Sequence, residues 1–307
     1  MVKTCILFHV YVLILVLLFL IVEASSSNSN DKTSPNSLFV KHFLGSKRGD
    51  TVEGLGQVRK YLSKYGYLGP SMAGRYQRSP DTFNDSNVFD HDLRKGITKF
   101  QLFFNINVSG ILDEETLSIM VKPRCSLPDL VNGTPIKHGI KLVRNPINSS
   151  YYEFLPSPKW SKFNLTWYKY SESRPESISP LTFAFKTWKD NSKFNFVRAS
   201  SYGGSDVTIH FGNANTTNIR NFKDFSIAYT TNLPDPNIYF NVKIPWVVGD
   251  SPDGYDIETT AVHEIGHILG LAHTSVQEAV MFPTASMGKI KRNLHNDDIA
   301  GITALYP

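Results

Sequence analysis

The sequence predicts an α+β protein in which a twisted mixed sheet packs against helices and is preceded by a small helical domain. Three observations support this class. Apolar residues recur at helical spacing before residue 120, several segments after residue 160 have the composition of strands, and the last 50 residues contain two helical stretches. A run of strands interrupted by one helix and followed by two more is typical of an α+β domain. The length of 307 residues allows one or two domains.

The first 24 residues have the features of a cleaved secretory signal peptide. Lys3 precedes an apolar run over residues 5–22, and Val22 and Ala24 are the small residues that signal peptidase requires. A polar linker over residues 25–37 follows. The alternative is an uncleaved membrane anchor, because an apolar run of 18 residues is nearly long enough to cross a bilayer.

Other features of the composition also favour secretion. Cys5 lies in the predicted signal peptide, so the exported chain keeps only Cys125 and contains no internal disulfide. The net charge of +5 is spread along the chain without a basic block, which argues against a nucleic-acid partner. Six N-x-[ST] sequons give modest support for the secretory pathway, at Asn84, Asn107, Asn132, Asn148, Asn164 and Asn215.

We expect three helices between residues 38 and 120. The first two are indicated by apolar residues at helical spacing, and Asp113 is suited to cap the third, which runs to Met120. The apolar positions of the first two helices are Leu55, Val58 and Leu62, then Leu93, Ile97 and Phe100. We interpret these positions as the core of a small helical domain.

The second half of the chain contains the predicted sheet. Ser179-Pro180 is a suitable start for the helix that interrupts the strands, Asp256 for the next helix, and the last helix covers Leu294 to Tyr306. An edge strand of this sheet is expected to bind an extended peptide by strand addition. The expected strands are Phe163 to Tyr170, Phe194 to Ala199, Asp206 to Phe211, Ile227 to Thr231 and Ile238 to Val242.

The helix after Asp256 carries a metal-binding pattern. His263 and His267 are four residues apart, so both imidazoles lie on one helix face and can reach one metal ion. Gly270 can adopt the left-handed backbone that ends a helix, which allows His273 to return as a third ligand. Three nitrogen ligands suit zinc and leave a fourth position for water, as in catalytic sites. Glu264 is placed to accept a proton from that water.

Cys125 is the second candidate ligand. A thiolate held over the zinc would displace the water that hydrolysis requires. Arg124 and Asp129 carry opposite charges and are expected to fix this loop by an ion pair. The alternative is an inert free thiol.

These motifs resemble the matrix metalloproteinases (matrixins), and the compact, cysteine-poor chain resembles the plant members without a hemopexin domain. The pattern H-E-x-x-H-x-x-G-x-x-H and Met281, in Val280 to Pro283, match the zinc helix and methionine turn of metzincins. The segment from Pro123 to Asp129 matches the propeptide pattern P-R-C-G-x-P-D. The resemblance implies a metzincin-like catalytic domain over residues 152–307, a propeptide with a cysteine switch over 38–129, and an activation connector over 130–151.

The resemblance also assigns roles to three other residues. Asp297 and Asp298 match the family's acidic pair, in which one carboxylate binds the new amino terminus after activation and the other supports the methionine turn. Both are also suited to the first turn of a helix capped by Asn296. Ser126 stands where the family has glycine, and we expect strain and weaker latency if this position needs a positive φ.

The metal sites ahead of the zinc helix depart from the family. Matrixins carry H-G-D, L-A-H-A-F and H-F-D-x-D-E patterns there, which hold a structural zinc and calcium. This chain has Asn213-Ala214-Asn215, Ile227-Ala228-Tyr229 and Tyr239 to Ile244 instead, and Lys243 would repel a cation. We therefore expect one catalytic zinc and no structural zinc, and the calcium site is doubtful. His210 and His295 are expected to have structural roles.

The expected protein is a secreted zinc metalloendopeptidase, made as a latent zymogen for the extracellular space or cell wall. It is expected to be a monomer without a stable membrane span after signal cleavage, and to hydrolyse proteins or peptides with Glu264 as general base. Its substrate preference would depend on the loop from Phe282 to Asn293. One alternative is a catalytically impaired matrixin-like protein, because the structural metal sites are missing. The other is a cell-wall-binding protein, because the segment from Asn105 to Asp113 resembles peptidoglycan-binding-like domains.

Overall fold

The computed structural model describes residues 35–68, 86–130, 154–155, 158–170, 174–212 and 226–307. The chain divides into two compact units, residues 1–42 and 43–307. Helix α2 (Pro35–Phe43) forms the end of the first unit, and its last residue belongs to the second. No helix in the described part of the chain is long and apolar enough to span a membrane.

Some sequence-based predictions lie outside the described residues. They are the signal peptide, most of the polar linker and of the connector, and the segment Asn213-Ala214-Asn215. The same applies to the sequons at Asn84, Asn132, Asn148 and Asn215. These predictions stay predictions.

The second unit begins with the helical domain, and its three predicted helices are present as α3 (Leu55–Lys64), α5 (His91–Phe103) and α6 (Glu114–Met120). Asp113 caps α6 as predicted, because its carboxylate accepts a hydrogen bond from the Thr116 backbone N–H. The predicted apolar positions of these helices are buried. Helix α2 was not predicted from the sequence.

The main sheet has the strand order β2-β1-β3-β5-β4, and among its strands only the edge strand β4 runs antiparallel to its neighbour. All five strands coincide with predicted segments to within a few residues. Their bounds are β1 (Asn164–Tyr170), β2 (Asn195–Arg198), β3 (Val207–Gly212), β4 (Ala228–Thr230) and β5 (Asn237–Asn241). The mixed sheet and the helices confirm the predicted α+β class.

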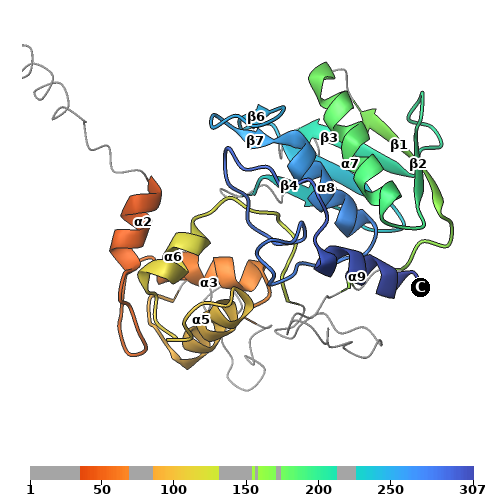
Figure 1. The fold of residues 1–307 in the computed structure, drawn as a ribbon. Helices are drawn as coiled ribbons and strands as arrows, with labels where there is room; N and C mark the ends of the chain where they lie inside the picture. Colours follow the sequence, from red (N-terminus) through yellow and green to blue (C-terminus); the bar gives the residue numbers. More distant parts are fainter. Residues whose placement is uncertain (1–34, 69–85, 131–153, 156–157, 171–173, 213–225) are drawn as a thin grey trace, which may run out of the picture. The chain divides into compact units, whose positions relative to one another are not determined.

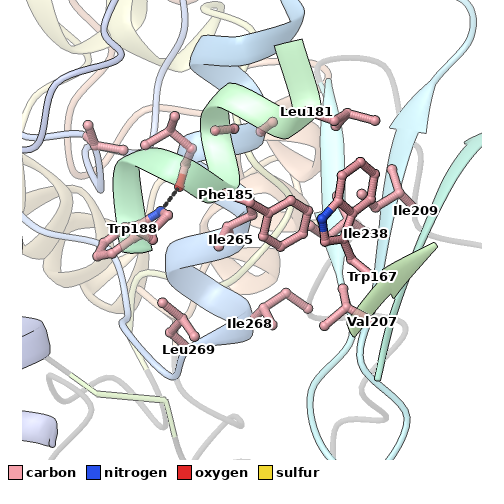
Figure 2. Close-up of a cluster of buried hydrophobic side chains, with 14 of the residues drawn as sticks. Trp167, Leu181, Phe185, Trp188, Val207, Ile209, Ile238, Ile265, Ile268 and Leu269 are labelled. Carbon is pink, nitrogen blue, oxygen red and sulfur yellow. Dashed lines mark hydrogen bonds between the residues drawn. The ribbon is translucent and has the colours of Figure 1, made fainter. Parts of the chain in front are cut away.

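Two helices, α7 (Ile178–Asp190) and α8 (Ile257–Ile268), cover one face of this sheet (Figure 1). Figure 2 shows the core between these helices and the sheet. There the Trp167 ring of β1 stacks on the Phe185 ring of α7, with 4.9 Å between the ring centroids. The Trp188 indole N–H donates a hydrogen bond to the Val262 carbonyl at 2.7 Å, which fixes α7 against α8. Helix α8 is buried on almost every side, so the polar residues it carries lie inside the protein.

The structure also corrects details of the sequence reading. A short 3₁₀ helix, η2 (Pro175–Ser177), precedes α7, which therefore begins before Ser179. The two-residue strands β6 (Trp246–Val247) and β7 (Tyr255–Asp256) form a second, parallel pair that is too short to have a sequence signature. The last helix, α9 (Asn296–Leu305), is capped by His295 rather than by Asn296. The His295 imidazole accepts a hydrogen bond from the Asp297 backbone N–H, and the Asp298 carboxylate accepts one from the His295 N–H.

Candidate active site

The predicted metal ligands converge at the end of α8. Asp256 caps this helix, as predicted, by accepting a hydrogen bond from the Thr259 N–H at 2.9 Å. His263 and His267 lie one turn apart, with 3.0 Å between their Nε2 atoms. Gly270 has the predicted left-handed backbone, with φ at 101°. The chain therefore turns back, and His273 Nε2 comes within 3.2 Å of His267 Nε2.

The hydrogen bonds of the three imidazoles show that this cluster suits a cation. Each Nδ1 faces an acceptor: the Val280 carbonyl for His263 at 2.7 Å, the Leu271 carbonyl for His267 at 2.8 Å, and an Asp129 carboxylate oxygen for His273 at 2.7 Å. These acceptors favour a proton on each Nδ1, which leaves the three Nε2 lone pairs pointing at one another. Such lone pairs repel unless a metal ion lies between them.

The protonation state of the ligands agrees with this interpretation. Burial lowers the pKa of all three imidazoles, to about 3 for His263. They are therefore neutral at physiological pH, which is the form that binds zinc. Cys125 supplies a fourth donor, and the ligand atoms of the four residues all lie within 4.8 Å of one another. A set of three nitrogens and one sulfur is chemically suited to zinc.

Met281 lies directly beneath the metal-ligand helix. Met281 can approach the helix this closely because residue 266 is a glycine. A Cβ atom at Gly266 would lie 2.3 Å from Met281 Sδ and 2.9 Å from the Trp188 ring. Asp298 holds the turn, since its carboxylate accepts hydrogen bonds from the Val280 and Met281 N–H groups at 2.9 and 3.1 Å. The structure thus places Asp298 against the turn that carries Met281; the sequence analysis left open which carboxylate of the pair does this.

We predict that Gly266→Ala destabilises the protein by about 1–3 kcal/mol, because the added methyl group overpacks a dense core. The displaced Met281 would also shift the metal ligands above it, so zinc affinity should fall with stability. Chemical denaturation and zinc competition measure the two effects. Gly203→Ala is a control for the general cost of removing a glycine, because a Cβ atom there meets nothing within 4 Å and the residue is not among those with a positive φ. A Gly266→Ala variant as stable as the unchanged protein would contradict the packing argument.

The segment from Pro123 to Asp129 crosses the candidate active site, and Arg124 within it forms a parallel bridge with Ser226 and an antiparallel bridge with Thr284. On one side, the Ser126 N–H donates to the Ala228 carbonyl of β4, and the Ile227 N–H donates to the Arg124 carbonyl. On the other side, the Cys125 N–H donates to the Pro283 carbonyl at 3.0 Å. A segment of the helical domain thus occupies the edge of the sheet by the strand addition that the sequence analysis predicted for a peptide.

Cys125 projects from this segment toward the metal cluster. Its Sγ atom lies 3.5 Å from His267 Nε2, and its side chain is buried. Burial raises the pKa of the thiol well above its usual value, and the charge of the nearby Glu264 carboxylate raises it further. A divalent cation at the site has the opposite effect, because it stabilises a coordinated thiolate.

Asp129 fixes the same segment through several buried contacts. Its carboxylate pairs with Arg124, whose guanidinium also lies 3.6 Å from the centre of the Tyr65 ring. It accepts a hydrogen bond from the Tyr67 hydroxyl at 2.5 Å, in addition to the one from His273. Burial alone would raise the pKa of Asp129, but Arg124 and His273 lower it, so the carboxylate is ionised. Asp129 therefore connects the loop, the helical domain and a candidate metal ligand.

The structure contradicts the premise that Ser126 needs a positive φ. Among the described residues other than glycine, only Asn105 and Arg174 have a positive φ. Ser126 is therefore free of that strain, and the argument for weaker latency is wrong in this respect. The serine differs from the family's glycine only by a buried hydroxyl group, which has no hydrogen-bond partner among the described residues.

Glu264 is the predicted base, and its side chain is completely buried. Burial raises the pKa of this carboxylate to about 7. Its Oε2 atom accepts a hydrogen bond from the Thr230 hydroxyl, whereas Oε1 has no hydrogen-bond partner among the described residues. Sequence reasoning missed Thr230, because no local pattern connects β4 with α8.

A cavity of about 510 Å³ adjoins His263. It is lined in part by Val280, Pro283 and Lys291, and two of these residues belong to the loop that was predicted to set substrate preference.

His210 has no place in the metal-ligand cluster. Its ring stacks on that of Tyr239, with 4.7 Å between the ring centroids. The expected structural role of His210 fits this arrangement.

Comparisons with known proteins agree with this geometry. Residues 159–307 match the family model described as Matrixin, and residues 51–120 match the one described as "Putative peptidoglycan binding domain". Metalloendoproteinase 2-MMP of Arabidopsis thaliana is 33% identical over 288 residues, which cover 86% of this chain and 74% of that protein. This chain belongs to the matrixin family.

Other matrixins show the same relationship. Metalloendoproteinase 1 of Glycine max is 30% identical over 270 residues, covering 84% of this chain and 83% of that protein. Matrix metalloproteinase-20 of Homo sapiens is 32% identical over 224 residues, covering 68% of this chain and 41% of that protein. The matrixin described here is accordingly a zinc metalloendopeptidase, and its predicted family, fold class and enzyme class are confirmed.

Proposed function

We propose that this matrixin is a secreted endopeptidase, made as a latent zymogen, that cleaves extracellular proteins with Glu264 as general base. His263, His267 and His273 hold the catalytic zinc, and Cys125 is its fourth ligand in the zymogen. The observation that carries the proposal is the convergence of these four buried donors, with Cys125 contributed by the segment that follows helix α6. Residues 38–129 are then the propeptide, 130–151 the activation connector and 152–307 the catalytic domain.

The chemistry follows from the position of Glu264. When bound, zinc supplies Lewis acidity that polarises the substrate carbonyl and acidifies water. Glu264 Oε1, which has no hydrogen-bond partner among the described residues, accepts one proton from the attacking water while the carbon–oxygen bond forms. The same oxygen gives that proton to the leaving nitrogen as the carbon–nitrogen bond breaks. The carboxylate is regenerated, and one water is consumed per bond.

The substrate takes the place of the segment from Pro123 to Asp129. This segment uses the Ala228 carbonyl and the Ile227 N–H of the sheet edge, and an extended peptide can use the same groups after the propeptide leaves. A substrate side chain then enters the cavity beside α8, whose wall includes residues of the predicted loop from Phe282 to Asn293. Protein or peptide substrates therefore fit the geometry.

Activation is proposed to involve the acidic pair at the start of α9. Asp298 is occupied by the methionine turn, whereas Asp297 Oδ1 is buried and receives no hydrogen bond from the described residues. A buried carboxylate oxygen of this kind suits the positively charged amino terminus that cleavage of the connector creates. The other supporting residues, Arg124 and Asp129, act in the zymogen by closing the propeptide loop.

The remaining parts of the proposal concern location and rival functions. The predicted signal peptide and the exposed sequon residues Asn107 and Asn164 support secretion of a glycoprotein to the extracellular space or cell wall, and the monomeric state stays a prediction. A catalytically impaired protein is disfavoured because the ligands and the base are together. The match to a peptidoglycan-binding family keeps wall binding by the helical domain as a second candidate function. Retention of the isolated full chain on insoluble wall polymer would support it.

A zinc titration tests the main proposal. We expect the activated, metal-free protein to cleave a peptide library only after zinc is added, with activity saturating at one zinc per chain. One ion is expected because Tyr229, Tyr239 and Lys243 stand where the family pattern has metal ligands. Metal analysis of the purified protein gives an independent count. Two tightly bound zinc ions per chain would contradict the single-zinc proposal, and cleavage by the metal-free protein would contradict the mechanism.

A further inference from the structure

The second oxygen of the Glu264 carboxylate is held by a residue outside the motif. The Thr230 hydroxyl donates a hydrogen bond to Glu264 Oε2, and both side chains are buried. Thr230 is the last residue of β4, where it pairs with Ile238 of β5. Its position is well defined, because a β-branched side chain on a paired strand has few rotamers. The donor is therefore fixed relative to α8.

The two oxygens of Glu264 have different surroundings as a result. Oε2 is occupied by Thr230, whereas Oε1 has no hydrogen-bond partner among the described residues. Cys125, which points into the metal cluster, lies beside the same carboxylate. The hydrogen bond from Thr230 thus prevents the carboxylate from rotating freely and keeps one oxygen available at the fourth metal position.

This hydroxyl is a departure from the family pattern. In L-A-H-A-F, which matches the stretch from Ile227 to Thr231, alanine stands where this chain has Thr230. Alanine cannot donate a side-chain hydrogen bond. A buried threonine hydroxyl could instead have donated to a backbone carbonyl, as the neighbouring Thr231 hydroxyl does to Asp235 at 2.6 Å. Donation to the catalytic carboxylate is therefore a specific feature of this site.

We propose that Thr230 is a positioning residue that orients Glu264 for proton transfer. The proposal rests on Glu264 being the base. Thr230 does not touch the reacting atoms; it occupies Oε2 so that Oε1 meets the water. Loss of the hydroxyl leaves zinc and the substrate groove in place but lets the carboxylate adopt unproductive rotamers. The effect should therefore appear in kcat and not in KM.

The test compares variants that separate the hydroxyl from the side-chain shape. Thr230→Val keeps the shape and removes the donor, and we expect kcat to fall by about 10- to 100-fold with KM and zinc content unchanged. Thr230→Ser restores the donor and should recover kcat to within about threefold of the unchanged enzyme. Thr230→Ala replaces Thr230→Val in the comparison with Thr230→Ser if the valine variant does not fold. Thr231→Val is the matched control and should keep kcat.

Several outcomes would overturn the proposal. One is a Thr230→Val enzyme with unchanged kcat; another is an equal loss in the valine and serine variants, which would indicate packing rather than hydrogen bonding. A loss of zinc that accounts for the lost activity would also overturn it. Glu264→Ala separates this proposal from the assignment of the base. If that variant is inactive while Thr230→Val is fully active, only the role of Thr230 fails.

Discussion

Glu264→Ala is expected to abolish peptide cleavage while leaving zinc bound. The carboxylate is completely buried, and its free oxygen is the proton acceptor in the proposed mechanism. General base catalysis contributes about 10²- to 10⁴-fold, and Glu264 also serves as the acid for the leaving amine, so we expect a loss near the upper limit. The three imidazoles keep their own hydrogen-bond partners without Glu264. Zinc content and kcat of the activated enzyme measure the two properties separately.

Glu258→Gln is the matched control for this experiment. Glu258 lies on the same helix, but its carboxylate pairs with Arg292 at 3.2 Å, near the start of α8 and away from the metal ligands. This change should leave kcat within a few-fold of the unchanged enzyme, because the glutamine side chain keeps an oxygen that can accept from Arg292, and Arg292 also pairs with Asp256 at 2.7 Å. Turnover retained in Glu264→Ala would refute the assignment of the base. Loss of zinc from that variant would show that Glu264 also supports the metal site.

The metal-binding helix could be predicted because its information is local. A spacing of four residues places His263 and His267 on one face of any helix, and Gly270 supplies the backbone conformation that ends it. The five strands of the main sheet were found for a similar reason, since their composition marks them along the chain. Asp113 and Asp256 could be recognised as caps because the residues that they bind lie three positions further on.

Contacts between distant residues that lie outside the recognised motifs could not be predicted from the sequence. The hydrogen bond between Asp129 and His273 joins positions 144 residues apart, and that between Thr230 and Glu264 joins positions 34 apart. Neither pair has a pattern that a sequence shows. Backbone conformation at a single residue is equally hard to infer, which explains the wrong premise about Ser126. At the start of α9, either His295 or Asn296 could cap the helix. The structure has His295 as the cap, because its backbone N–H donates to the Asp298 carboxylate.

Cys125→Ala is expected to produce an intact chain that cleaves peptides without prior removal of the propeptide. The thiol lies 3.5 Å from His267 Nε2 and closes the fourth position of the proposed zinc site. Without this ligand, the segment from Pro123 to Asp129 keeps its backbone hydrogen bonds, the contacts of Arg124 and Asp129, and the packing of Leu127. We expect the activity of the uncleaved chain to rise at least about 100-fold, because the open state becomes more populated. Turnover by intact protein, verified by mass, is the measurement.

Ser126→Ala is the control for disturbing the segment itself, because the Ser126 hydroxyl has no hydrogen-bond partner among the described residues. It should leave latency unchanged. Asp129→Asn tests the second restraint, since it weakens the buried pair with Arg124 and the contact with His273 together. Breaking a buried ion pair costs about 3–5 kcal/mol. The segment from Pro123 to Asp129 should therefore leave the active site in this variant too, and the intact chain should become active. If Cys125→Ala stays silent while Asp129→Asn is active, latency depends on the blocked sheet edge and not on the thiol. The reverse result would assign latency to the fourth ligand and would contradict the role proposed for Asp129 in closing the loop.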